Sequence, residues 1–227
     1  MIDLRNEYNV DAPRAKGMYL ENAPQEIWGS PDWCLEPKYD GQRVTLQIGK
    51  CKSILLGRNR VDFLKGVSKA GPYRRQDEVN PRLTAMVDDE LAGTVLDGEL
   101  TEVYKQDGTY DKMTMERLRT GQYVGYVVWG VLFFKGVDVR NQSEWSRRVM
   151  AEYAVQKLTE KFKWAGGRLK VTPRMEATLE NLKKLFEAGY EGGVVKKVNA
   201  PIPEGSRTNP NWWKVKGAQF RTVDAFV

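Results

Sequence analysis

The chain has 227 residues, and its 36 lysines and arginines exceed its 30 aspartates and glutamates, which gives a net charge of +6. This length fits one domain or two small ones, and a hydrophobic content of 41% excludes a disordered chain. The sequence contains no histidine, which excludes histidine triads, histidine-ligated zinc and phosphohistidine relays.

The first half of the sequence predicts mainly strands. The expected elements are a hairpin of strands at 44–48 and 53–56, a helix at 80–93, and strands at 94–96 and 123–134. The hairpin turns at Gly49-Lys50. Asn80 and Pro81 are typical of a helix start and Gly93 of a helix end. This helix would carry Leu83, Met86, Val87 and Leu91 on one face.

The second half predicts two helices and two short strands. Ser143 is a suitable cap for a helix that carries Trp145, Val149, Tyr153 and Leu158 at helical spacing. A second helix starts near Thr178 and ends at Gly189, with Leu179, Leu182, Leu185 and Phe186 directed inward. Strands are expected at 194–195 and 212–215. Because strands and helices do not alternate regularly, the sequence favours an α+β fold with antiparallel sheets.

The two cysteines, Cys34 and Cys51, form no CxxC pair and have no neighbours that would activate a thiol, so we assign them no role. Two free thiols favour a reducing compartment. Residues 1–5 do not resemble a signal peptide, and the longest apolar run, 126–134, is far shorter than the roughly 20 residues of a membrane helix. We therefore expect a cytoplasmic protein with no membrane partner.

Segment 36–43 groups the side chains with the clearest chemical potential: Glu36, Lys38, Asp40, Gly41 and Arg43. Pro37 favours an extended backbone, in which Glu36, Lys38 and Asp40 point to the same side. A lysine with the reference pKa of about 10.4 is neutral in only about one molecule in 2,500 at pH 7, so a nucleophilic Lys38 needs a nearby cation or metal ion. A charged surface turn is the alternative interpretation.

Further segments decide between these interpretations, because they follow in a characteristic order. They are 56–59 with Arg58, then 96–100, 126–132, 191–196 and 213–216. Together with 36–43 they resemble the covalent nucleotidyltransferases, which comprise ATP-dependent DNA ligases, RNA ligases and mRNA capping enzymes. In this resemblance 36–43 is similar to motif I, and the later segments, from 96–100 on, are similar to motifs III, IIIa, IV and V. The similarity extends over about residues 16–224.

The resemblance to ATP-dependent DNA ligases implies an ATP-grasp-like nucleotidyltransferase domain of antiparallel sheets flanked by helices. It implies a domain over residues 1–220, with 221–227 starting a linker to an OB domain that is absent here. Lys38 would form a covalent lysyl–AMP with ATP and pass the AMP to the 5′-phosphate of nicked double-stranded DNA. We expect a monomer.

The same resemblance implies roles for individual side chains. The nucleotide ligands would be Glu36, Arg43, Arg58, Glu99, Trp129, Lys196, Lys214 and Lys216. Glu36 would accept a hydrogen bond from the adenine amino group, which favours ATP over GTP. Trp129 would stack on the purine, although Gly130 stands where the family often has aspartate. Lys196 would contact the α-phosphate.

The implied metal and nucleic-acid contacts complete this set. Glu99 and Glu191 would bind Mg²⁺ or Mn²⁺. The lysines of 213–216, Lys214 and Lys216, lie two residues apart on one face of a strand and would neutralise phosphate charge and help to deprotonate Lys38. The ribose and the nick would be contacted by Asp40, Arg43 and Arg58.

Three alternatives remain open at this point: an RNA ligase, an mRNA guanylyltransferase, and an inactive module that only binds nucleic acid or nucleotides. Loss of Lys38, Glu99 or Glu191 would indicate the inactive module, and all three are present. The basic stretch with Lys65, Lys69, Arg74 and Arg75 is a candidate contact to a nucleic-acid backbone or a solvated loop.

Overall fold

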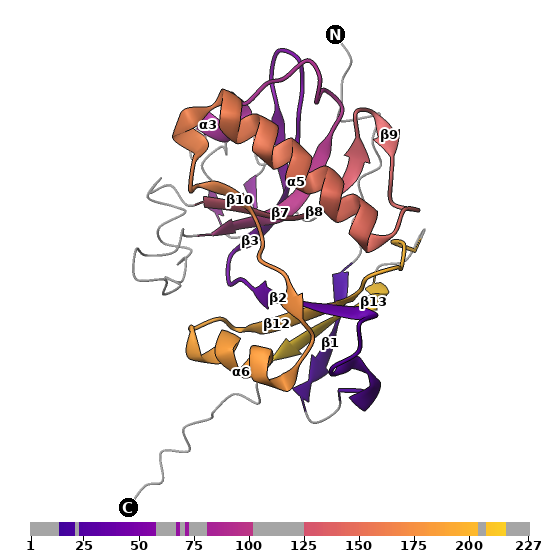
Figure 1. The fold of residues 1–227 in the computed structure, drawn as a ribbon. Coiled ribbons are helices and arrows are strands. Elements are labelled where there is room, and N and C mark those ends of the chain that lie inside the picture. Colours follow the sequence, from indigo (N-terminus) through magenta and orange to yellow (C-terminus); the bar gives the residue numbers. More distant parts are fainter. Residues whose placement is uncertain are drawn as a thin grey trace, which may run out of the picture.

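The computed structural model describes residues 14–20, 23–57, 67–68, 71–72, 81–101, 125–203 and 208–216. These residues form two main sheets, each with a helix packed against it (Figure 1). Helix α5 runs across the six-stranded sheet, which contains β7, β8 and β10, and α6 lies against the five-stranded sheet, which contains β2, β12 and β13. The predicted α+β class is confirmed.

The five-stranded sheet has the order β1-β13-β12-β2-β11. Its strands are β1 (Arg14–Tyr19), β2 (Trp33–Lys38), β11 (Met175–Glu176), β12 (Gly192–Lys197) and β13 (Thr208–Lys216). All neighbours are antiparallel except β1 and β13, which run parallel. The short 3-10 helix η2 (Gln25–Ile27) lies between β1 and β2 in the chain.

The six-stranded sheet has the order β10-β8-β7-β3-β4, with β9 paired to β8. Its strands are β3 (Gln42–Gln47), β4 (Ile54–Gly57), β7 (Val95–Thr101), β8 (Gly125–Phe134), β9 (Val137–Asp138) and β10 (Leu169–Val171). The pair β5 (Val67–Ser68) and β6 (Gly71–Pro72) is separate. The predicted hairpin and the strands at 94–96 and 123–134 are confirmed, with bounds shifted by a few residues.

Helix α6 (Leu179–Glu187) confirms the second predicted helix. Thr178 caps it, because its hydroxyl oxygen accepts a hydrogen bond from the Asn181 N–H. Leu182 and Leu185 are buried in a cluster with Leu35, Val195 and Val215 from the five-stranded sheet. Gly189 follows the helix with φ of 85°, as predicted for a glycine at a helix end, whereas Leu179 is 49% exposed.

Helix α5 (Glu144–Lys161) starts at the predicted cap, Ser143, but buries a different face from the one marked by its large apolar residues. Trp145, Val149 and Tyr153 are exposed. The small residues Ala151 and Ala154 pack against the six-stranded sheet instead, together with Leu158. Short side chains let the helix lie close to the sheet, and charged residues occupy the rest of its buried face.

The predicted helix over 80–93 is wrong in length, since α3 comprises only Pro81–Thr84. Leu83, Met86 and Leu91 are fully buried as expected. The backbone beyond α3 instead turns against the hairpin: the Asp88 N–H donates to the Gly49 carbonyl, and the Asp88 carboxylate accepts from the Leu91 N–H. These contacts replace the hydrogen bonds that would continue the helix.

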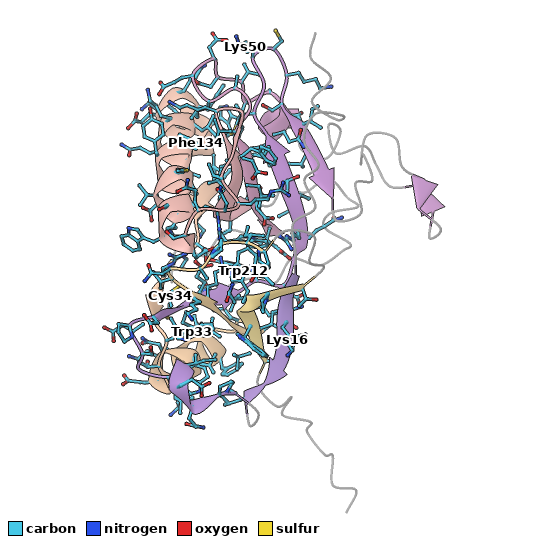
Figure 2. The ribbon with its side chains drawn as sticks, turned by 90° about the vertical axis from the view of Figure 1, so that its right-hand side faces the viewer. Lys16, Trp33, Cys34, Lys50, Phe134 and Trp212 are labelled. Atoms are coloured by element: carbon cyan, nitrogen blue, oxygen red, sulfur yellow. The ribbon has the colours of Figure 1, made fainter. Side chains whose placement is uncertain are left out.

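The chain passes between the two sheets at two places that matter for the site. Residues 39–41 connect β2 to β3, and residues 172–174 connect β10 to β11. The sheets also touch through side chains: Trp212 of β13 packs with Val95 and Leu132 of the other sheet. Figure 2 shows Cys34 and Trp212 near the level where the two sheets meet, and Lys50 at the far end of the molecule.

Candidate active site

The register of the five-stranded sheet aligns the predicted functional lysines. Gly192 of β12 lies opposite Lys38 of β2 on one side and Lys216 of β13 on the other. Residues directly opposite each other in an antiparallel ladder point to the same face. Val194 is likewise flanked by Glu36 and Lys214, so Lys38 and Lys216 share the face opposite to α6 with these two residues.

Glu191 joins the two lysines at the start of β12. Its Oε2 accepts a hydrogen bond from Lys38 Nζ, and its Oε1 pairs with Lys216 Nζ. Burial acts to raise the pKa of Glu191, but the hydrogen bonds from Lys216 and Lys38 outweigh it and lower the pKa below its ordinary value. The carboxylate is therefore charged at neutral pH and holds the Lys38 amine in place.

Two adjacent glycines let the strands of this row approach closely. Gly192 has φ of 153°, and a Cβ on it would collide with the Val215 carbonyl oxygen. A Cβ on Gly193 would collide with the Leu35 side chain on the opposite face. The Gly-Gly pair of segment 191–196 is thus required by the packing of β12 between β2 and β13.

The six-stranded sheet contributes a second charged group on the face opposite to α5. Arg43 Nε and Nη2 donate to Asp97 Oδ1 and Oδ2 at 2.9 and 2.6 Å. The Arg43 guanidinium also lies 5.5 Å from the ring centroid of Trp129, which is half-buried on β8. This places the predicted purine-stacking ring beside a fixed cation.

Glu99 on β7 lies opposite Arg43 in the ladder, and its Oε1 accepts a hydrogen bond from the Gly41 N–H at 3.1 Å. A side chain on Gly41 would collide with the Leu100 carbonyl oxygen and with Glu99 itself. Burial raises the pKa of Glu99 from its ordinary value of 4.5 to about 7, against the opposing charges of Lys38 and Arg43. A further cation near Glu99 would therefore stabilise the charged form of this carboxylate.

We predict that Glu99→Gln changes the pH dependence of stability. The folded-state pKa of Glu99 lies above its ordinary value, so its stabilising contribution is complete below about pH 4.5 and is lost as the pH rises through about 7. Glutamine does not ionise. The free energy of unfolding of the variant should therefore rise relative to that of the unaltered chain between pH 5 and 8, by at most about 3 kcal/mol.

Urea unfolding at pH 5, 6.5 and 8 without divalent ions measures this difference. The control is Glu26→Gln, which alters an exposed carboxylate on η2. Parallel pH profiles for Glu99→Gln and the unaltered chain would contradict the prediction.

A buried ion network surrounds Glu36 and Lys196. Lys196 Nζ lies 2.8 Å from Glu36 Oε2 and 3.3 Å from Glu144 Oε1, and it is only 3% exposed. Arg174 bridges the same two carboxylates at 2.7 and 2.9 Å. Cys34 adjoins this network, and burial raises the pKa of its thiol to about 12. The network places Lys196 beside Glu36, while the contact of Lys196 with the α-phosphate stays a prediction.

Sequence analysis missed the other members of this network: Glu144, Arg147, Arg148 and Arg174. The only sequence signal for these residues is that Glu144, Arg147 and Arg148 stand close together in the first turns of the predicted helix. The structure brings together Lys38, Glu191 and Lys216 in one group, and Arg43, Glu99 and Trp129 in another. Asp40 is exposed in the connection 39–41, and Lys214 is half-buried on β13.

Several predictions fall outside what the structure tests. Arg58 and the basic stretch with Lys65, Lys69, Arg74 and Arg75 lie outside the described residues. Within the described ranges, no cluster of three or more aspartate, glutamate, cysteine or histidine side chains is arranged to hold a metal ion. In the same part of the chain, no helix has the length and apolar character needed to span a membrane.

Comparisons with known proteins agree with this geometry. The family model described as the ATP-dependent DNA ligase domain matches residues 20–216. Among solved structures, a mycobacterial DNA ligase D complexed with ATP and MES shares 21% identity and a TM-score of 0.61, over 92% of this chain and 62% of that chain. The ligase domain of M. tuberculosis LigD gives 19% identity and 0.60, over 92% and 62%.

The ATP-dependent DNA ligase of bacteriophage T7 in complex with ATP gives 19% identity and a TM-score of 0.55, over 91% of this chain and 69% of that chain. At these identities the likeness establishes the fold, and the chain spans 62% of the length of the first two structures. A comparison with curated proteins gives no match.

Proposed function

Because the chain belongs to the ATP-dependent DNA ligase domain family, we propose that it transfers AMP from ATP to its own Lys38 and then to the 5′-phosphate of a nick in double-stranded DNA. The observation that carries the proposal is the contact of Lys38 with Glu191, in a row completed by Lys216. Glu191 fixes the position of the Lys38 amine, and the positive charge of Lys216 opposes the tendency of that carboxylate to keep the amine protonated.

In the first step Lys38 Nζ attacks the α-phosphorus of ATP. The N–P bond forms while the bond from the α-phosphorus to the bridging oxygen breaks, and pyrophosphate leaves with that oxygen. The Lys38 ammonium paired with Glu191 has no lone pair, so it first releases one proton to solvent, which the positive charge of Lys216 favours. The neutral amine that attacks loses a second proton as the N–P bond forms, and Glu191 Oε2, which already accepts a hydrogen bond from Nζ, receives it. Lys216 on the other oxygen of Glu191 balances the charge of this group and of the incoming phosphate.

The nucleoside would lie between the base-contacting and ribose-contacting groups. Glu36 would accept from the adenine amino group, and Trp129 would stack on the purine. Arg43, fixed by Asp97 and lying over the Trp129 ring, would stand at the ribose side together with Glu99. In the second step the nick 5′-phosphate attacks lysyl–AMP and releases the Lys38 amine, and the 3′-hydroxyl then displaces AMP to seal the strand.

A magnesium ion fits the residues on this side of the site. Mg²⁺ prefers carboxylate, phosphate and water oxygens, and Glu99 is a carboxylate whose pKa burial raises to about 7, so a bound cation would favour its charged form. Glu191 is already neutralised by two lysines, so Glu99 is the stronger of the two predicted ligands. When bound, the ion would supply charge neutralisation at the phosphate oxygens.

Intact mass spectrometry tests the proposal. The chain incubated with ATP and Mg²⁺ should gain one AMP, pyrophosphate should remove it, and GTP should label it far less. Sealing of nicked DNA, compared with sealing of nicked RNA, then tests the substrate. No adduct with ATP would overturn the proposal, adduct formation with GTP alone would indicate a guanylyltransferase, and sealing of RNA alone would indicate an RNA ligase.

A further inference from the structure

The ion network around Glu36 contains more buried charge than base recognition by one carboxylate requires. Glu36 and Glu144 are each 2% exposed, and four cations surround them: Arg147, Arg148, Arg174 and Lys196. Removing charged groups from water is costly unless each has partners with good geometry. A buried network of this size is therefore expected to fix the orientation of its members.

Arg174 has the geometry to fix Glu36. Its Nε and Nη2 both donate to Glu36 Oε1, at 3.0 and 2.7 Å, and Nη2 also donates to Glu144 Oε1 at 2.9 Å. Arg174 lies in the connection 172–174, where the chain passes from one sheet to the other. Glu144 is the first residue of α5, and its N–H donates to the Ala200 carbonyl.

The contacts also limit how Glu36 can rotate. A charged carboxylate has about four acceptor positions. The two on Oε1 are directed at Arg174, and one on Oε2 is directed at Lys196, 2.8 Å away. The acceptor capacity that remains for a ligand is therefore on Oε2, in a direction that the two cations determine.

We propose that Arg174, held by Glu144, is a positioning residue that orients the Glu36 carboxylate toward the nucleobase and thereby sets the preference for adenine over guanine. This inference rests on the proposed function. Adenine presents an amino donor where guanine presents a carbonyl oxygen, and a carboxylate that cannot turn away leaves that oxygen without a donor partner. Discrimination by a buried polar group depends on such an unpaired contact.

The test compares covalent labelling by ATP and GTP in variants of the full chain. Arg174→Met removes both hydrogen bonds to Oε1 at similar side-chain volume, and we expect the ratio of kcat/KM for ATP over GTP to fall at least tenfold, mainly through a higher KM for ATP. Arg174→Lys, which keeps one charged donor, should restore part of the ratio. In a chain that already carries Glu36→Gln, adding Arg174→Met should not change the ATP-to-GTP ratio further, because the Glu36 carboxylate that Arg174 orients is no longer present.

The matched control is Arg140→Met. Arg140 donates to the Asp138 carboxylate at 2.6 Å and lies outside the ion network around Glu36. This variant should leave the ATP-to-GTP ratio within twofold. If Arg174→Met does not fold, Arg174→Lys is compared with the control instead.

The outcomes separate the inference from the function on which it rests. Labelling of the unaltered chain with an unchanged ratio in the Arg174 variants would overturn the inference alone. An equal fall in the ratio for Arg140→Met would show that removal of an arginine outside the network has the same effect as removal of Arg174, and would also overturn the inference. Absence of labelling in the unaltered chain would overturn both.

Discussion

Replacing Lys38 with alanine is expected to reduce covalent labelling by ATP at least about 10³-fold, to the limit of detection, because the phosphoramidate bond is made to its amine. Lys38→Arg is expected to be equally inactive. A guanidinium can keep the ion pair with Glu191, but it stays protonated and does not act as a nucleophile. The pair of variants therefore separates loss of the nucleophile from loss of the positive charge.

Intact mass after incubation with ATP and Mg²⁺ provides the measurement, with Lys50→Ala as control. Lys50 is exposed at the tip of the β3–β4 hairpin, remote from the level where the sheets meet (Figure 2). In Lys38→Ala the Glu191 carboxylate keeps its ion pair with Lys216, so the substitution leaves no buried charge without a partner. Labelling that survives in Lys38→Ala would refute the assignment of the nucleophile.

The sequence was sufficient to predict the parts of the site that lie within short segments. Glu36 and Lys38 share a face because β2 is extended, and Lys214 and Lys216 share the same face of β13 for the same reason. The strand periodicity also predicted the hairpin of β3 and β4. These features depend on residues two positions apart, for which the backbone alone determines direction.

The buried network could not be predicted, because its members are far apart in the chain. Arg174 and Glu36 are separated by 138 positions, and their contact depends on how the connection 172–174 passes between the sheets. Helix α5 was misleading for a different reason. Trp145, Val149 and Tyr153 are exposed, whereas Glu144 and Arg147 are buried, so at the start of the helix burial followed from ion pairing rather than from hydrophobicity.

Glu191→Ala is expected to slow the labelling of Lys38 by at least about 10²-fold, since it removes both the group that holds the Lys38 amine and the acceptor for its proton. Glu191→Gln keeps the size and one oxygen acceptor but no longer takes a proton at neutral pH. We expect glutamine to be nearly as slow as alanine, because the lowered pKa of Glu191 keeps the native side chain charged at neutral pH, and glutamine has no charged oxygen that could take the proton.

Single-turnover labelling at saturating ATP measures this rate without a contribution from product release. The control is Glu187→Gln at the end of α6. The Glu187 side chain is 62% exposed, and its one described ion pair is a long contact of 3.7 Å with Lys183 on the surface. Lys216 remains 48% exposed, so loss of its partner should change the free energy of unfolding by less than about 1 kcal/mol. A rate for Glu191→Gln within tenfold of the unaltered chain, with alanine slow, would contradict proton transfer to Glu191 and leave it the role of holding Lys38 in position.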